Sequence, residues 1–229
     1  MGESKNQNFN HLKIHSQYSI CEGAIKIDDL KDFSKENKIK SLALSDTTNL
    51  CGALEFAEKI SKVGTQPIIG TQINFRFSGT TGLLPLYALN EAGYKRLIEL
   101  SSLSYLKNDK LSDPYLEFEE LLKKNDGLAL FSGTIYGLFG QLFDKGKFTE
   151  ISELYLKLKS CYQDKFYIEI QRHSEQNEFA FEKFNLAQSF DLEIPLIATN
   201  EVFYLNKDMH EAHDALICIK NKSYVNEKN

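Results

Sequence analysis

Short apolar runs alternate with amphipathic stretches along most of the chain. The apolar runs are rich in β-branched and aromatic residues, and they predict strands at residues 11–15, 41–45, 67–75, 83–89, 127–131, 166–171 and 195–199. The stretches between them carry apolar residues at helical spacing and predict helices at 26–36, 50–63, 91–105, 116–123, 148–161, 175–190 and 207–219. Alternation of strands and helices is typical of right-handed βαβ units, so the pattern predicts an α/β fold with a parallel sheet.

About seven such repeats follow one another without a break in composition. This favours a single domain that is closed, or nearly closed, as a barrel, and an open doubly wound sheet is the alternative. Two stretches rich in turn-forming residues, 77–82 and 107–114, are expected to be surface loops.

Composition narrows the possible functions. The chain has 229 residues, a hydrophobic share of 42% and a formal net charge of −5, which argues against a free-standing nucleic-acid-binding protein. No apolar run is long enough for a membrane span, and the polar first residues do not form a secretion signal. The four cysteines are scattered and form no CxxC pair, so we expect reduced thiols in a cytoplasmic protein.

Polar residues follow most of the predicted strands. In a parallel barrel the strand ends meet at one mouth, where active sites are built. These polar ends are His15-Ser16, Ser45-Asp46-Thr47, Gly70-Thr71-Gln72, Ser132-Gly133-Thr134, Arg172-His173 and Thr199-Asn200-Glu201. Among them and the loop that follows the first strand, only His15, Glu22, Asp46, His173 and Glu201 are good metal ligands, fewer than a site with several metals needs.

Two further features have simple interpretations. His210 and His213 are three positions apart on a predicted helix, where a solvated face is favoured over a metal site. The glycines at positions 133, 137 and 140 do not form a phosphate-binding loop, because the segment GTIYGLFG lacks the necessary pattern.

The order of several segments resembles the PHP (polymerase and histidinol phosphatase) domain. The version at the N-terminus of the bacterial replicative DNA polymerase III alpha subunit is the most similar. The segments that carry this resemblance are HLKIHSQYSICEGA (11–24), LALSDTTNLCGALEF (42–56), QPIIG (66–70), GYKRLIELSS (93–102), GLALFSG (127–133), FYIEIQRH (166–173) and PLIATNE (195–201). The resemblance covers residues 8 to 224, and it implies a distorted seven-stranded (β/α) barrel, a TIM-like PHP fold.

In active members of this family, nine ligands at the barrel mouth hold a trinuclear metal cluster that hydrolyses phosphoesters. This chain departs from that pattern at Lys13, Thr47, Gln72, Leu83, Thr134 and Phe203, which stand where the family has ligands. Ligand-capable side chains remain at His15, Glu22 and Glu201, with Asp46 and His173 as nearby polar groups. An ammonium group at Lys13 would repel divalent cations, so we expect Lys13 to pair with Glu22 or Glu201 instead.

The resemblance therefore implies a degenerate barrel with a structural role and no catalytic residues of its own. We expect no cofactor in this fragment, although the vestigial pocket could hold a single weakly bound zinc or manganese ion. In the full-length polymerase alpha chain, here called the parent chain, Mg²⁺ and carboxylates of a palm domain outside this sequence would catalyse DNA synthesis. The expected divisions are a tail at 1–9, the PHP domain at 10–224 and the start of a linker at 225–229.

The expected partners are the rest of the polymerase alpha chain, the proofreading exonuclease (epsilon) subunit, and DNA through the parent chain. Two other hypotheses remain. One is a metal-dependent phosphoesterase that uses a reduced site of His15, Glu22, Asp46, His173 and Glu201. The other is a non-enzymatic barrel with an unrelated binding role.

Overall fold

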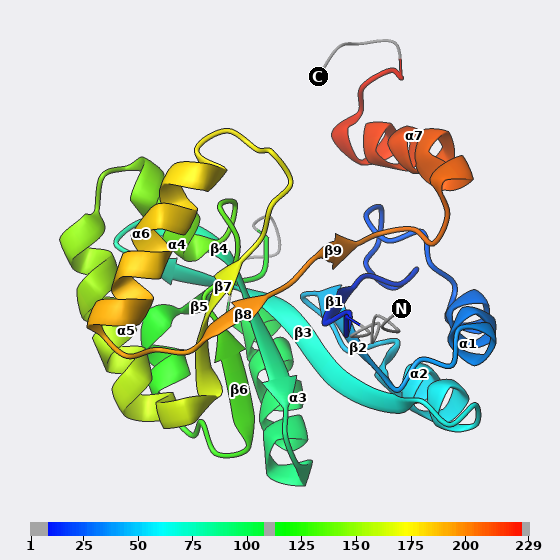
Figure 1. Ribbon diagram of the computed structural model, residues 1–229, viewed down its shortest axis with the longest axis horizontal. Coiled ribbons are helices and arrows are strands. Elements are labelled where there is room, and N and C mark those ends of the chain that lie inside the picture. The colour runs from blue at the N-terminus through cyan, green and yellow to red at the C-terminus, as the bar shows by residue number, and fades with distance from the viewer. Residues whose placement is uncertain (1–8, 108–112, 226–229) are drawn as a thin grey trace, which may run out of the picture.

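The strands of this computed structural model, which describes residues 9–107 and 113–225, lie side by side in one strongly curved sheet (Figure 1). The order along the sheet is β8-β7-β6-β4-β3-β2-β1-β9, and β5 pairs with β3 beside this path. The strands are β1 (Lys13–Ile14), β2 (Ser41–Thr47), β3 (Gln66–Phe77), β4 (Thr80–Ala88), β5 (Leu116–Glu117), β6 (Leu128–Phe131), β7 (Phe166–Ile170), β8 (Leu196–Ala198) and β9 (Glu201–Val202).

The two ends of this path belong to one extended segment of the chain. β8 pairs in parallel with β7, and β9 pairs in parallel with β1 after only two intervening residues. The segment from β8 to β9 therefore bridges both edges of the sheet, and the strands form a distorted ring. Counting β8 and β9 as one strand, and β5 as an addition to β3, the ring has the seven strands expected from the sequence.

One connection differs from the expected parallel arrangement. β3 and β4 form an antiparallel hairpin, and β4 also runs antiparallel to β6. The predicted surface loop at 77–82 is wrong, because only Ser78 and Gly79 lie between the two strands. Both residues have positive φ (47° and 75°), as the two-residue turns that match the twist of a hairpin require.

All of the α-helices except the last cover the outside of the ring (Figure 1). The α-helices are α1 (Ile27–Glu36), α2 (Ala53–Ser61), α3 (Glu91–Leu106), α4 (Leu138–Asp144), α5 (Phe148–Tyr162), α6 (Glu178–Asp191) and α7 (His210–Asn221), with short 3₁₀ helices at Phe118–Leu122, Gln163–Lys165 and Lys207–Met209. Helices α1 and α2 lie near β1 and β2, and α4, α5 and α6 lie together on the opposite side (Figure 1). Helix α7 stands apart from these, beyond β9.

Three apolar clusters hold these layers together. The largest joins strands β3 to β7 to α3, α4, α5 and α6, and a second joins β1 and β2 to α1 and α2. The third takes small or aromatic residues from β2, β4 and β6, with partly buried neighbours from β3, β7, β8 and the residue before β1. Because residues from β2, β3, β4, β6, β7 and β8 and the residue before β1 meet in this third cluster, it fills the inside of the barrel, as in other closed α/β barrels.

One predicted helix is wrong, and one helix of the structure was not predicted. The segment at 116–123 was expected to be a helix, but it forms β5 and then a 3₁₀ helix, because Leu116 and Glu117 pair with the end of β3. Helix α4 was missed, since it is short and begins among the glycines of GTIYGLFG. The predicted tail (1–9) and linker (225–229) fall almost wholly outside the described residues, as does most of the predicted loop at 107–114.

All four cysteines are free thiols. Within the described part of the chain, every helix is too short or too polar to cross a bilayer.

Candidate functional site

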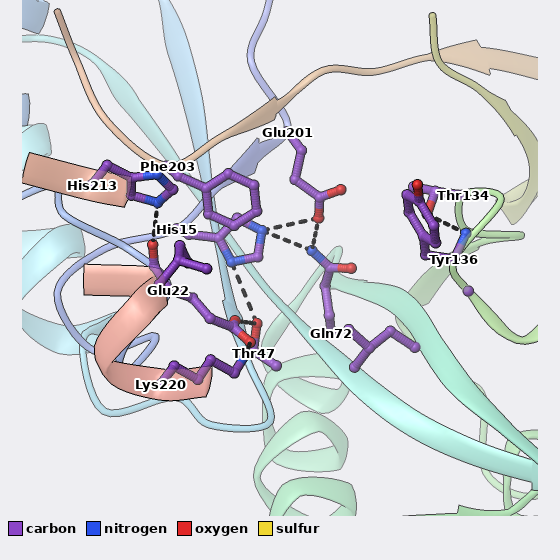
Figure 2. A pocket seen from close by; sticks show the side chains of 13 residues that line it. His15, Glu22, Thr47, Gln72, Thr134, Tyr136, Glu201, Phe203, His213 and Lys220 are labelled. Atoms are coloured by element: carbon purple, nitrogen blue, oxygen red, sulfur yellow. Dashed lines mark hydrogen bonds and ion pairs between the residues drawn. The ribbon is translucent and has the colours of Figure 1, made fainter. Parts of the chain in front are cut away.

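The carboxyl-terminal parts of the parallel strands and the amino-terminal half of the antiparallel β4 surround a pocket of about 290 Å³ (Figure 2). Eight of the nine positions aligned with family ligands line it: His15, Glu22, Thr47, Gln72, Leu83, Thr134, Glu201 and Phe203. The remaining lining residues are Tyr136, Gly137, His213, Ile217 and Lys220. The ninth aligned position, Lys13, is completely buried and lies against Glu201, which lines the pocket. The structure therefore brings together positions that the resemblance had selected from six separate stretches of the chain.

Lys13 lies between two carboxylates. Its Nζ is 3.2 Å from Glu169 Oε1 and 3.4 Å from Glu201 Oε1, and both the Lys13 and Glu169 side chains are fully shielded from solvent. The expectation that the Lys13 ammonium meets a carboxylate is confirmed for Glu201. Glu169, on β7, is an additional partner. A buried ammonium with two anionic neighbours is an internal counter-ion, because an unpaired charge in this position would be strongly destabilising.

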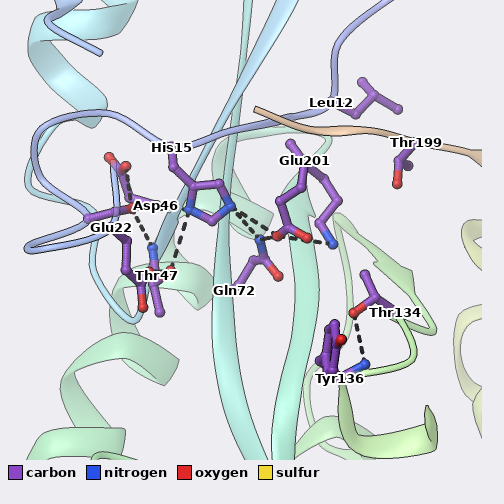
Figure 3. Close-up of polar contacts among 12 residues, drawn as sticks. Leu12, His15, Glu22, Asp46, Thr47, Gln72, Thr134, Tyr136, Thr199 and Glu201 are labelled. Carbon is purple, nitrogen blue, oxygen red and sulfur yellow. Dashed lines mark hydrogen bonds and ion pairs between the residues drawn. The ribbon is translucent and has the colours of Figure 1, made fainter. Parts of the chain in front are cut away.

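Glu201 collects several donors on one oxygen (Figure 3). His15 Nε2 lies 3.0 Å from Glu201 Oε1, and Gln72 Nε2 donates to the same atom at 2.7 Å. Burial alone would raise the pKa of the Glu201 carboxyl. The charge of Lys13 and the hydrogen bonds from His15 and Gln72 outweigh it, and they hold this pKa well below its usual range. The negative charge of Glu201 is thus already paired with donors and a cation from the same chain.

Glu22 is satisfied in the same way from the opposite side of the pocket (Figure 2). Its Oε1 forms an ion pair with Lys220 of α7, and its Oε2 accepts a hydrogen bond of 2.6 Å from Thr47 Oγ1. The backbone carbonyl of Glu22 lies 2.8 Å from His213 Nε2, which donates to it. These contacts connect the loop after β1 to the last helix.

Phe203 occupies the space beside the His15 imidazole (Figure 2). The two rings are stacked with centroids 4.5 Å apart and planes inclined by 22°, and the His213 ring stacks on Phe203 at 5.6 Å. An apolar ring therefore stands at a position where the family has a metal ligand, and it offers no lone pair to a metal.

Two residues of the predicted site lie outside the pocket. Asp46 is buried behind it, where its carboxylate accepts hydrogen bonds from Ser16 N at 2.7 Å, Ser16 Oγ at 2.8 Å and Ser19 Oγ at 2.8 Å. Asp46 therefore fixes the turn that follows β1. His173 is exposed, and its Nε2 is 2.6 Å from Asn200 Oδ1 in a neighbouring pocket.

Sequence reasoning missed three residues that shape the site: Glu169, His213 and Lys220. Glu169 is the only charged residue in the strand segment FYIEI, and a lone charge in a buried strand is a signal of an internal partner. The interpretation of His210 and His213 as one solvated face holds only for His210, since His213 is half-buried against Glu22 and Phe203. No local pattern marks Lys220 as a partner of Glu22.

The residues around this pocket do not fit a metal cluster. Among the residues that the structure describes, no three His, Cys, Asp or Glu side chains are placed so that they could hold a metal ion. The positive charge of Lys13 also opposes metal binding, because its Nζ is only 3.4 Å from Glu201 Oε1. A zinc-like ion bound about 2 Å from that oxygen would lie within about 5.5 Å of the ammonium. The repulsion would be on the order of 6 kcal/mol at an effective dielectric constant of 20.

Comparison with known proteins agrees with this geometry. The family model for the PHP domain matches residues 11–173. The chain is 36% identical to the DNA polymerase III subunit alpha of Caulobacter vibrioides over 99% of its own length and 21% of that protein. It is 35% identical to the same subunit of Rickettsia conorii, over 96% of the chain and 19% of that protein. The chain thus spans about a fifth of the length of these relatives.

A solved structure supports the fold independently. An amidohydrolase from Chromobacterium violaceum superposes with a TM-score of 0.57 at 12% identity, over 88% of this chain and 89% of that one. At this identity the likeness concerns the barrel alone. The family model matches most of the chain, and this shows that the chain belongs to the PHP domain family.

Proposed function

We propose that this chain is the N-terminal PHP domain of a DNA polymerase III alpha subunit, and that the barrel has a structural role. The support is the similarity to two alpha subunits over nearly the whole of this chain. In the proposed parent chain, DNA-templated synthesis with Mg²⁺ is carried by residues outside this sequence. The domain would work in the cytoplasm, attached to the rest of the alpha chain, and would meet DNA only through that chain.

One observation above all supports the proposal that the barrel has a structural role. Both carboxylates that remain at ligand positions are already paired with a lysine of the same chain, Glu201 with Lys13 and Glu22 with Lys220. A divalent metal would have to displace or repel these ammonium groups before it could bind. Ion pairs within the chain thus take the place that metal–carboxylate contacts have in active family members, and we propose that no phosphoester hydrolysis occurs here.

Metal analysis and an activity assay test this part of the proposal. We expect purified protein to contain less than one equivalent of zinc, manganese or iron. Hydrolysis of a chromogenic phosphate ester with added Mn²⁺ or Zn²⁺ should not exceed that of His15→Ala. A single weakly bound ion without turnover would leave the structural role intact. Two or more stoichiometric metals, together with hydrolysis that His15→Ala abolishes, would establish the phosphoesterase instead.

A second part of the proposal concerns partners. We propose that the domain contacts the proofreading exonuclease (epsilon) subunit of the same polymerase. Co-purification of the two proteins, followed by size-exclusion chromatography, measures this directly. If they elute separately at micromolar concentrations, the contact is excluded and the polymerase assignment stands. A reading frame that ends shortly after Asn229 would instead contradict the assignment itself.

A further inference from the structure

Glu169, the second carboxylate beside Lys13, uses its two oxygens very unequally. Its Oε1 lies 3.2 Å from Lys13 Nζ. The same oxygen accepts hydrogen bonds from Gln171 Nε2, at 3.1 Å, and from Thr199 Oγ1. Its Oε2 is buried and has no hydrogen-bond partner among the described residues. Because a buried carboxylate oxygen without a donor is strongly unfavourable, we expect a donor beside Oε2.

Asn185, on α6, has the complementary imbalance. The residue is 1% exposed, and its Oδ1 accepts a hydrogen bond of 3.1 Å from the Tyr155 hydroxyl. Its Nδ2 is buried and donates to none of the described residues. An amide nitrogen carries two protons, whereas a carboxylate oxygen offers lone pairs. The donor missing at Glu169 and the acceptor missing at Asn185 therefore match in kind, although no direct hydrogen bond joins the two atoms in the described part of the chain.

A small cavity lies where these two side chains meet, between β7 and α6. Its volume is about 10 Å³, and its walls include Glu169 of β7, Asn185 and Phe181 of α6, and Thr134 and Ile135 after β6. This volume is enough for one water molecule and far too small for an organic ligand. Buried waters are typically found where otherwise unpaired polar groups face such a space.

We propose that this cavity binds one water molecule, which accepts a hydrogen bond from Asn185 Nδ2 and donates one to Glu169 Oε2. The water connects β7 to α6, so the internal counter-ion of Lys13 is linked to the helical layer outside the barrel. A metal cation does not suit the cavity, because Asn185 Nδ2 offers protons there instead of a lone pair. This inference does not depend on the polymerase assignment.

A crystal structure that resolves ordered waters tests the proposal. We expect one water oxygen within about 2.7–3.2 Å of both Asn185 Nδ2 and Glu169 Oε2. In solution, NMR should show a nuclear Overhauser effect between the side-chain amide protons of Asn185 and water. Its sign should be that of a long-lived contact, because a buried water is costly to remove.

Two variants locate the water. Asn185→Leu keeps a side chain of similar shape but removes the donor, so the crystal structure of this variant should lack the water. The matched control is Tyr162→Phe on α5, which removes a buried hydrogen bond of 2.9 Å to the Leu121 carbonyl oxygen outside the cavity. This variant should keep the water. Circular dichroism melting verifies that both variants fold, and the measurements on the unsubstituted protein decide the question if Asn185→Leu does not.

Three outcomes would overturn the proposal. One is a direct hydrogen bond between Asn185 Nδ2 and Glu169 Oε2 with no water between them. Another is a well-ordered cavity without water density, together with the absence of the nuclear Overhauser effect. The last is a water that persists in Asn185→Leu or disappears in Tyr162→Phe, since it would then be held by other groups.

Discussion

Replacing Lys13 with methionine should be among the most destabilising single changes in this chain. The ammonium is fully buried and lies within 3.4 Å of two carboxylates, one of which is itself fully buried. Methionine fills a similar volume but leaves Glu169 and Glu201 without a cation. Breaking a buried ion pair by removing one partner costs about 3–5 kcal/mol, which is a large part of the roughly 5–15 kcal/mol that stabilises a typical domain.

The assay is urea unfolding at pH 7, followed by circular dichroism, for Lys13→Met and for a matched surface control. The control is Lys95→Met, because Lys95 pairs with Glu91 while both side chains are more than 70% exposed. An exposed pair of this kind contributes only about 0–1 kcal/mol. We expect the free energy of unfolding to fall by several kcal/mol for Lys13→Met and by less than about 1 kcal/mol for the control.

A double variant separates charge from packing. Glu169→Gln in the Lys13→Met background removes one of the stranded carboxylates, so part of the lost stability should return. The loss should also shrink on acidification. In the unsubstituted protein the pKa of Glu201 is lowered. The ionised Glu201 therefore stabilises the fold at pH values above its unfolded pKa of about 4.3. This contribution is lost as the pH falls toward the folded pKa. A loss below about 1 kcal/mol, or an absence of coupling between positions 13 and 169, would refute this reasoning.

Three further predictions follow from the structure. Lys220→Met removes the ion pair with Glu22, so amide hydrogen exchange should become faster in α7 and stay unchanged elsewhere. Unchanged exchange in α7 would mean that other contacts hold this helix in place. Hydrogen bonds from neighbouring lysines lower the pKa of Glu120 to about 2, so the free energy of unfolding should decline between about pH 4.3 and pH 2. In acid unfolding curves this decline should be smaller for Glu120→Gln, and identical curves for the two proteins would contradict the prediction. Gly93→Ala should cost on the order of 1–3 kcal/mol in thermal unfolding, because a Cβ at position 93 would meet the Gly127 carbonyl oxygen at 1.8 Å; an unchanged melting temperature would mean that the two backbones move apart easily.

Local patterns predicted most elements of the barrel, because burial in a parallel sheet leaves a clear mark on the sequence. The segment SLALS is nearly all apolar, and it lies inside β2 with five consecutive buried residues. The antiparallel β4 was not predicted to reverse direction, because strand direction depends on the turn. The decisive residues there are Ser78 and Gly79, and serine only rarely adopts a positive φ.

The positions around the pocket were predictable, but their contacts were not. Family alignment selected His15, Glu22 and Glu201, and all three line the same pocket. Their partners come from distant segments, as Lys220 does for Glu22, and no spacing rule connects residues almost 200 positions apart. Glu169 could be recognised as unusual in its strand, but its partner at position 13 is visible only when β1 and β7 are placed around one barrel.

The segment that joins β8 to β9 also affects how the barrel is assembled. It pairs with both edges of the sheet, and His15 and Glu201, which meet across one of these edges, are 186 positions apart. Contacts between such distant residues form late, because a long loop must be closed first. During synthesis the first strand can pair with β2 early, but its other edge and the buried lysine have to wait for their partners until nearly the whole domain has left the ribosome. Chains that stop before Glu201 would lack the closing strand, leave both sheet edges open and be prone to aggregation.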